Sequence, residues 1–233
     1  MPTSNLPSAP SRETLVPSSA LHQRAYEEIK RRIVSGTFAP DSFLSERQLA
    51  QSLGMSKTPV HIALKRIEAE GYVVISPQQG IVVRGLAPAD ILDHYEFREA
   101  LESFVVRRLA GRLDPYQIAA LQRSLEDQTT ALSADDTSTL LELDASFHYL
   151  LASCLGNRQI LATMEQLRDK IRLVIVRVSS LRRERFEESV REHAAILDAI
   201  MDGDAAAAER ALIEHLEAGK RQILSRGDPL RYP

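Results

Sequence analysis

One aspartate and three histidines in the C-terminal half of the chain have side chains that bind transition metals. Asp144 and His148 are four residues apart, so a helix would place both side chains on one face, about one turn apart. His193 and His215 each lie beside aliphatic neighbours in segments with helical periodicity, which favours an inward orientation. Three imidazoles and one carboxylate converging in a core would suit Zn²⁺ or another divalent transition ion, with coordination positions left for water or a ligand.

The same four residues also have a simpler interpretation. A histidine beside an apolar helix face is commonly a core residue whose ring nitrogens are held by hydrogen bonds. Spacing within one helix does not show that separate helices bring the four side chains together. From the residues alone, a metal site and a set of hydrogen-bonded core histidines both stay open.

The segment that must position these side chains is predicted to be helical. From Pro88 onward, helical periodicity is interrupted by short stretches rich in Gly, Asp, Asn and Ser. These breaks delimit predicted helices at residues 88–110, 115–132, 138–155, 158–180, 184–202 and 204–225. No strand-like alternation occurs between them, so we expect a C-terminal all-α six-helix bundle.

A second group of motifs, nearer the N-terminus, predicts two short helices joined by a tight turn. Ser45 begins the first helical pattern with Gln48 at the third helical position, which is the arrangement of a capping box. Gly54 stands where a helix ends in the left-handed conformation. Ser56 is expected to cap the second helix, whose apolar positions, such as Val60, recur at helical spacing.

Two β-rich segments follow this helix pair. Tyr72–Ile75 and Ile81–Val83 have strand propensity, and Pro77–Gly80 has the residues of a turn. Helix, turn, helix and hairpin together predict a winged helix-turn-helix, mainly α with a small β-hairpin wing. The alternative is a small α+β unit without a binding role.

Polar donors at the start of the second helix favour the nucleic-acid interpretation. Ser56, Lys57, Thr58 and His61 are small or cationic, and side chains at that end of a helix can meet phosphates and base edges. Residues 21–86 contain nine Lys and Arg against six Asp and Glu, whereas residues 87–233 contain 19 against 25. The basic part of the chain is therefore the part with the helix-turn-helix pattern.

This N-terminal region resembles the DNA-binding domain of the GntR family of bacterial transcription regulators. The matching segments are Leu44-Ser45-Glu46-Arg47, Gly54-Met55-Ser56-Lys57-Thr58-Pro59-Val60 and Glu68-Ala69-Glu70-Gly71. The resemblance implies a regulator that reads an inverted repeat of operator DNA as a homodimer.

The resemblance also assigns DNA contacts. It implies that Arg47, Ser56, Lys57 and Thr58 contact DNA, and that a wing around Gln79 and Gly80 reaches the minor groove. The family usually carries Arg-Glu after the Thr-Pro-Val segment, where this chain has His61-Ile62. Loss of a guanidinium fork at His61 changes one phosphate or guanine contact and is expected to alter the operator sequence.

The C-terminal region resembles the FCD effector-binding domain of the FadR subfamily. The resemblance rests on Phe97-Arg98-Glu99-Ala100-Leu101-Glu102, the Asp144/His148 pair, Glu192-His193 and Gly203-Asp204 followed by His215. In metal-binding members, one Asp and three His of this pattern hold a divalent ion. It therefore implies a metal site at Asp144, His148, His193 and His215, with Zn²⁺ favoured and Ni²⁺ or Mn²⁺ possible.

Arg98 has two interpretations. By resemblance, its guanidinium faces the same pocket and binds the carboxylate of a small organic acid effector. Alternatively, it forms a salt bridge with Glu102, one helical turn away.

These expectations combine into one function and its alternatives. We expect a repressor whose operator affinity is controlled by a small carboxylate bound at the metal. The alternatives are a regulator with a sensed or structural metal and no organic effector, and, more remotely, a metal-dependent hydrolase.

The chain is expected to divide into five segments. They are a disordered arm over residues 1–20, a DNA-binding domain over 21–86, a linker over 87–90, a helical domain over 91–226 and a tail over 227–233. The Pro- and Ser-rich arm lacks the apolar core of a signal peptide, and no apolar run reaches the roughly 18 residues of a membrane span. These features predict a cytoplasmic protein with no membrane partner.

Overall fold

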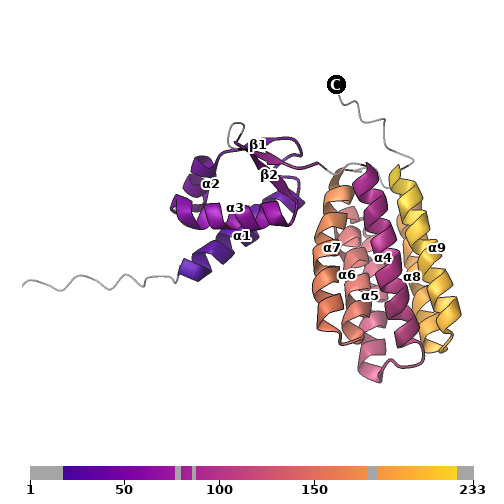
Figure 1. Ribbon diagram of the computed structural model, residues 1–233. Helices are drawn as coiled ribbons and strands as arrows, with labels where there is room; N and C mark the ends of the chain where they lie inside the picture. The colour runs from indigo at the N-terminus through magenta and orange to yellow at the C-terminus, as the bar shows by residue number, and fades with distance from the viewer. Residues whose placement is uncertain (1–17, 77–79, 86–87, 178–182, 225–233) are drawn as a thin grey trace, which may run out of the picture. The chain divides into compact units, whose positions relative to one another are not determined.

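The computed structural model describes residues 18–76, 80–85, 88–177 and 183–224. Its internal contacts separate two compact units: the first comprises residues up to Arg31 together with Pro40–Arg84, and the second comprises Arg32–Ala39 together with the residues from Gly85 onward. The first unit carries most of α1, α2 and α3 with a small sheet, and the second carries α4 to α9 (Figure 1). The predicted fold class, a winged helix-turn-helix followed by an all-α bundle, is confirmed.

The first unit is a helix-turn-helix with a three-stranded antiparallel sheet of order β1-β3-β2. Its elements are α1 (Ser18–Val34), β1 (Phe43–Leu44), α2 (Glu46–Leu53), α3 (Lys57–Ala69), β2 (Val73–Ser76) and β3 (Gly80–Val83). Strands β2 and β3 pair from Val73 with Val83 to Ser76 with Gly80, and this pair is the predicted hairpin. The sequence did not indicate β1, because two residues are too few to show alternation.

Helix α2 ends at the predicted glycine, Gly54, and α3 is also followed by a glycine, Gly71, whereas the predicted serine side-chain caps are absent. Gly54 has φ +63° and Gly71 has φ +83°, which is the left-handed region that glycine adopts without strain. Ser45 and Ser56 stand at the two N-cap positions, but neither side chain makes a capping hydrogen bond. The predicted capping box between Ser45 and Gln48 is therefore wrong.

The core of the first unit joins α1, α2, α3 and the sheet. Its buried apolar side chains include Ala25, Ile29, Leu49, Val60, Leu64, Ile67, Tyr72 and Val83. At its edge, the Tyr26 hydroxyl donates to Glu70, and Lys30 Nζ lies 3.0 Å from a Glu70 oxygen. This contact ties α1 to the end of α3.

The second unit consists of helices that run side by side (Figure 1). In the described part of the chain they are α4 (Pro88–Leu109), α5 (Pro115–Ser133), α6 (Thr137–Cys154), α7 (Arg158–Arg177), α8 (Arg183–Met201) and α9 (Ala205–Leu224). Their bounds lie close to the predicted ones. Two segment limits differ, because α1 begins within the predicted arm and α4 begins within the predicted linker. The tail over 227–233 and most of the arm lie outside the described residues.

Two glycine turns bring the helix ends of the bundle together. Gly111, after α4, and Gly203, after α8, have φ +66° and +76°, and a Cβ on Gly111 would lie 3.3 Å from the Gly203 Cα. The Gly111 N–H also donates to the Ile200 carbonyl at 2.8 Å. This close approach fixes α4 against α8 at one end of the bundle. None of the helices in the described ranges has both the length and the apolar character needed to span a bilayer.

Candidate metal centre

The bundle brings Asp144, His148, His193 and His215 together in its interior. One ligand-type atom from each of the four residues lies within 4.8 Å of the corresponding atom of every other. Each of the three histidines is at least 96% buried, on α6, α8 and α9. The i, i+4 spacing of Asp144 and His148 on α6 places both side chains in the cluster, and Phe147 stacks on His193 with ring centroids 4.3 Å apart.

The Nε2 atoms of the three histidines point at one another. The Nε2–Nε2 distance is 3.1 Å between His148 and His215 and 3.3 Å from His193 to each of them. Asp144 Oδ1 lies 3.5 Å from His193 Nε2 and accepts a hydrogen bond from the Ser189 hydroxyl at 2.8 Å. The carboxylate therefore faces the same point as the three imidazoles.

The other nitrogen of each ring is held by an acceptor from a different helix. His148 Nδ1 lies 2.6 Å from Glu102 Oε2, and His215 Nδ1 lies 2.7 Å from Glu192 Oε2. His193 Nδ1 lies 2.8 Å from Gln128 Oε1. Since these oxygens accept, each Nδ1 carries the proton, and each Nε2 of the neutral ring presents a lone pair to the centre.

Burial favours the neutral rings that this arrangement needs. It lowers the pKa of His193 well below its ordinary value, and the neighbouring His215 acts in the same direction. Burial also lowers the pKa of His215, although its hydrogen bond with Glu192 acts in the opposite direction. Burial alone would raise the pKa of Glu102, but the charge of Arg98 and the hydrogen bonds from His148 and Arg98 outweigh it and lower that pKa to about 2.

This donor set fits a divalent transition ion. Three lone pairs converging at 3.1 to 3.3 Å repel one another unless a cation lies between them. Two nitrogens bound at roughly 2.0–2.1 Å to one tetrahedral ion stand about 3.3–3.4 Å apart, close to the distances here. Carboxylate and amide oxygens on the remote ring nitrogens are also the partners that ligating histidines usually have.

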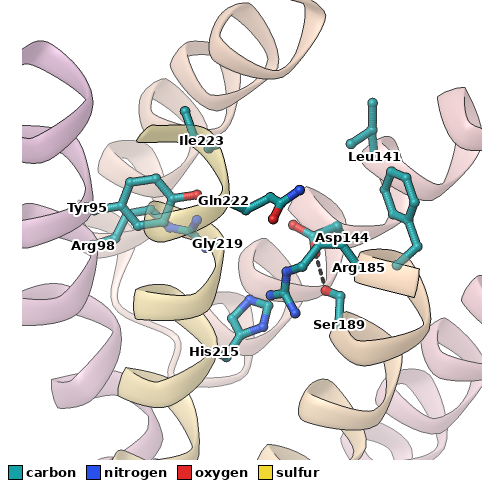
Figure 2. Close-up of a pocket in the computed structure, with 11 residues that line it drawn as sticks. Tyr95, Arg98, Leu141, Asp144, Arg185, Ser189, His215, Gly219, Gln222 and Ile223 are labelled. Atoms are coloured by element: carbon teal, nitrogen blue, oxygen red, sulfur yellow. Dashed lines mark hydrogen bonds between the residues drawn. The ribbon is translucent and has the colours of Figure 1, made fainter. Parts of the chain in front are cut away.

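A cavity of about 50 Å³ opens beside this cluster. Figure 2 shows that its wall combines α4 residues with residues of α6, α8 and α9, and that Asp144 and His215 belong to both the cavity and the cluster. Gly219 forms part of the wall because a Cβ there would lie 3.0 Å from the Tyr95 hydroxyl. A larger residue at this position would require the Tyr95 side chain to shift.

Two arginines line the cavity. Arg98 is 98% buried and donates from Nε to Glu102 at 2.6 Å, so the salt bridge considered from sequence is present. Its Nη2 atom, in contrast, is buried without a hydrogen-bond partner among the described residues. Arg185 forms a two-pronged contact with Glu192, at 2.9 and 2.8 Å. The wall therefore contains two guanidinium groups, of which that of Arg98 has a buried donor that an anion could satisfy.

The polar residues assigned to DNA contact lie on the surface of the first unit. Arg47 on α2 and Ser56, Lys57, Thr58 and His61 at the start of α3 are all exposed. Gly80 begins β3 with φ +86° and is exposed, whereas Gln79 lies outside the described residues. His61 Nδ1 lies 3.2 Å from a Glu46 oxygen.

A winged helix-turn-helix joined to a helical bundle defines a class, the two-domain transcription regulators. Residues 21–83 match the gntR family of bacterial regulatory proteins, and residues 93–218 match the FCD domain. The chain belongs to the GntR family and carries its FCD domain.

Curated relatives agree with this membership. The transcriptional repressor RspR of Escherichia coli is 29% identical, over 87% of this chain and 89% of RspR. The repressor NanR of Klebsiella aerogenes is also 29% identical, over 85% of this chain and 83% of NanR. These relatives are transcription regulators rather than enzymes, so the chain is a DNA-binding transcription regulator and the hydrolase alternative is set aside.

Solved structures share the fold. The E. coli protein McbR/YncC superposes with a TM-score of 0.76 at 21% identity, covering 88% of this chain and 97% of that one. A GntR regulator from Rhodococcus sp. RHA1 has the same TM-score at 24% identity, covering 89% and 99%. At these identities the likeness concerns the fold alone.

Sequence reasoning missed the residues that support the cluster from other helices. Glu102, Gln128 and Glu192 hold the three Nδ1 atoms, and Arg185 lines the cavity. Glu102 and Glu192 belong to the segments that resemble the FCD domain, but their spacing in the sequence did not indicate that each would contact a histidine. Gln128 and Arg185 carried no signal at all.

Proposed function

We propose that this regulator couples operator binding to a small organic acid, bound beside a divalent ion at Asp144, His148, His193 and His215. The observation that carries the proposal is the convergence of three Nε2 lone pairs, each fixed by an acceptor on Nδ1. Such an arrangement is costly in an apolar interior unless a cation compensates it.

Zinc is the proposed ion. Three imidazoles and a carboxylate suit Zn²⁺, and Ni²⁺ or Mn²⁺ can use the same ligands when they are more available. A bound ion would offer its remaining coordination positions to oxygen atoms of a carboxylate. The cavity reaches two of the four proposed ligands, Asp144 and His215, so an acid in the cavity would lie beside the ion.

The cavity limits the size and charge of the effector. A volume of about 50 Å³ restricts the cavity to a small molecule. Arg98 Nη2 is a buried donor without a hydrogen-bond partner among the described residues. Arg185 is a second guanidinium group in the cavity wall. We therefore propose a small carboxylate that binds Arg98 and the ion together, with Arg185 as a further contact.

The proposed DNA interface is the exposed start of α3. Ser56, Lys57 and Thr58 would contact base edges and phosphates in the major groove, with His61 one turn along and Arg47 on α2 beside them. The wing at Gln79 and Gly80 would reach the minor groove. A homodimer with one such helix per protomer would read an inverted repeat.

The effect on transcription follows from linkage. A bound acid changes DNA affinity only when it favours one mutual arrangement of the two DNA-binding domains of the dimer. Relatives named as repressors, RspR and NanR, support a repressor role for this chain.

Thermal unfolding of chelator-stripped protein tests the proposal. Zn²⁺ is restored first, and a panel of small mono- and dicarboxylates is then added. An acid at about a hundred times its Kd should stabilise the protein by about 2.7 kcal/mol, which is several degrees for a domain of this size, and only when metal is present. The variant Arg98→Lys should keep the metal shift and lose most of the acid shift.

The other outcomes favour the other functions. A metal shift without any acid shift would support a metal sensor or a structural ion. No response to metal would mean that the three histidines are hydrogen-bonded core residues. An increase in unfolding temperature caused by the acid in metal-free protein would mean that the ion is not part of the acid-binding site.

A further inference from the structure

One face of α3 carries an apolar side chain among polar ones. Thr58, His61, Ile62 and Lys65 recur at spacings of three and four residues, so they share one stripe of the helix. The opposite face is buried in the core of the first unit, through Val60, Ala63, Leu64 and Ile67. Within the stripe, Ile62 is 43% exposed.

The polar neighbours of Ile62 on α3 have partners within their own domain. His61 contacts Glu46, and Lys65 Nζ lies 2.9 Å from Glu68 Oε2. Arg66 stacks over Tyr26, 3.7 Å from the ring centroid, and donates to Glu70. Ile62, which has no polar atom, therefore contributes an apolar surface at the centre of the exposed stripe.

The surroundings of Ile62 favour DNA over a protein partner. Lys65 stands on the same exposed side of α3 as Ile62, and Lys57 is exposed at the start of the helix, in a domain with nine Lys and Arg against six Asp and Glu. A basic surface of this kind attracts phosphates.

The major groove offers one kind of apolar group to such a side chain. Base edges there present hydrogen-bond donors and acceptors, together with the C5-methyl group of thymine. We propose that Ile62 packs against a thymine methyl and so specifies one T·A pair in each half-site. This inference rests on the proposed insertion of α3 into the major groove.

The proposal is tested with the full-length protein and duplex DNA. A duplex is first selected from a randomised library by the wild-type protein, and its affinity is measured by fluorescence anisotropy at fixed salt. Each thymine is then replaced in turn by deoxyuridine, which lacks only the methyl group. At one thymine per half-site, this change should weaken binding about fourfold, the effect of one buried methyl group.

The variant Ile62→Ala identifies the residue responsible. It should bind the selected duplex more weakly and be insensitive to deoxyuridine at the same thymine, so the two changes are not additive. The control Val74→Ala removes another exposed apolar side chain of this domain, 51% exposed on β2, and should keep the methyl sensitivity. In a second selection, Ile62→Glu should lose the thymine preference at that position.

Two results would overturn the inference in distinguishable ways. Wild-type protein that selects a duplex, but shows no methyl effect that depends on Ile62, would refute the thymine contact and leave the DNA interface standing. Failure of wild-type protein to select any duplex would refute the proposed interface and the contact together.

Discussion

The two units of this protein place their candidate functional side chains differently: on the surface in the first unit and in the interior in the second. In the first unit, the residues assigned to DNA, such as Lys57 and Thr58, are exposed on one helix face, and the core behind them is apolar. In the second unit, His148, His193 and His215 are buried, and each is held by a residue from another helix. The candidate functional residues are therefore accessible to a macromolecule in the first unit and shielded from solvent in the second.

This difference in burial determines how strongly an amino-acid substitution in each unit affects folding stability. A side chain on an exposed face can be replaced with little effect on folding, because it has few packing partners to lose. A buried polar group can be replaced only at the cost of leaving its partners unsatisfied. We therefore expect changes in the second unit to alter stability and metal binding together, and changes on the α3 face to alter DNA binding alone.

The largest expected effect is loss of the metal-dependent stability in His193→Ala. With free Zn²⁺ at about a thousand times its Kd, the wild-type protein should gain about 4.1 kcal/mol of unfolding free energy. The variant, which lacks one of the converging nitrogens, should lose most of this gain. The quantity compared is the difference in unfolding free energy with and without Zn²⁺, measured in each protein by denaturant unfolding.

A matched change in the first unit serves as the control. His61→Ala replaces an exposed histidine and should keep the full Zn²⁺-dependent gain. If Zn²⁺ increased the unfolding free energy of His193→Ala as much as that of the wild type, His193 would not be a ligand of the ion. That result would contradict the proposed buried metal centre.

A smaller effect is expected at Glu192, which contacts both His215 and Arg185. Glu192→Gln weakens the acceptor that fixes the His215 ring, so Zn²⁺ affinity should fall by about 10- to 100-fold. Isothermal titration calorimetry with Zn²⁺ measures this affinity in the variant and the wild type. Glu188→Gln, an exposed acid 3.6 Å from Arg185, is the matched control and should leave the affinity unchanged. An equal fall in both variants would point to general charge rather than support of His215.

The third effect concerns pH. Burial lowers the pKa of His94 to about 3, from an ordinary value of 6.5. Below pH 6.5 the unfolded chain binds a proton there and the folded protein does not, so unfolding free energy falls with decreasing pH. Each such histidine contributes about 1.4 kcal/mol per pH unit. In metal-free protein, His94→Gln should reduce the slope between about pH 6 and 4.5 by that amount, measured by urea unfolding; an unchanged slope would contradict a buried neutral His94.

The smallest effect is expected at Lys57 on the exposed face of α3. Lys57→Ala removes one phosphate contact, so the slope of log K against log salt for DNA binding should become shallower by about 0.9 per contact. Anisotropy titrations at several salt concentrations measure this slope. The Zn²⁺-dependent stability should not change, and a change there would show that the two units are not independent in this respect.

The contrast between the units also explains what the sequence could predict. The helix-turn-helix and its exposed donors follow from local patterns, because glycines such as Gly54 end helices through their own backbone. Asp144 and His148 were identified by spacing within one helix. Gln128 and Arg185 could not be identified, since their roles depend on how α5 and α8 pack. The side-chain caps at Ser45 and Ser56 were predicted from residue type, but the side chains make no capping bonds.

The measurement that tests the central claim most directly is DNA affinity with and without a stabilising acid, in metal-loaded and in metal-stripped protein. The duplex is the one selected by the wild-type protein, and anisotropy gives its Kd in the four conditions. We expect the acid to change the Kd at least fivefold in the metal-loaded protein and not in the stripped protein, as a coupling of about 1 kcal/mol or more requires. The same change in Kd with and without metal would contradict the account.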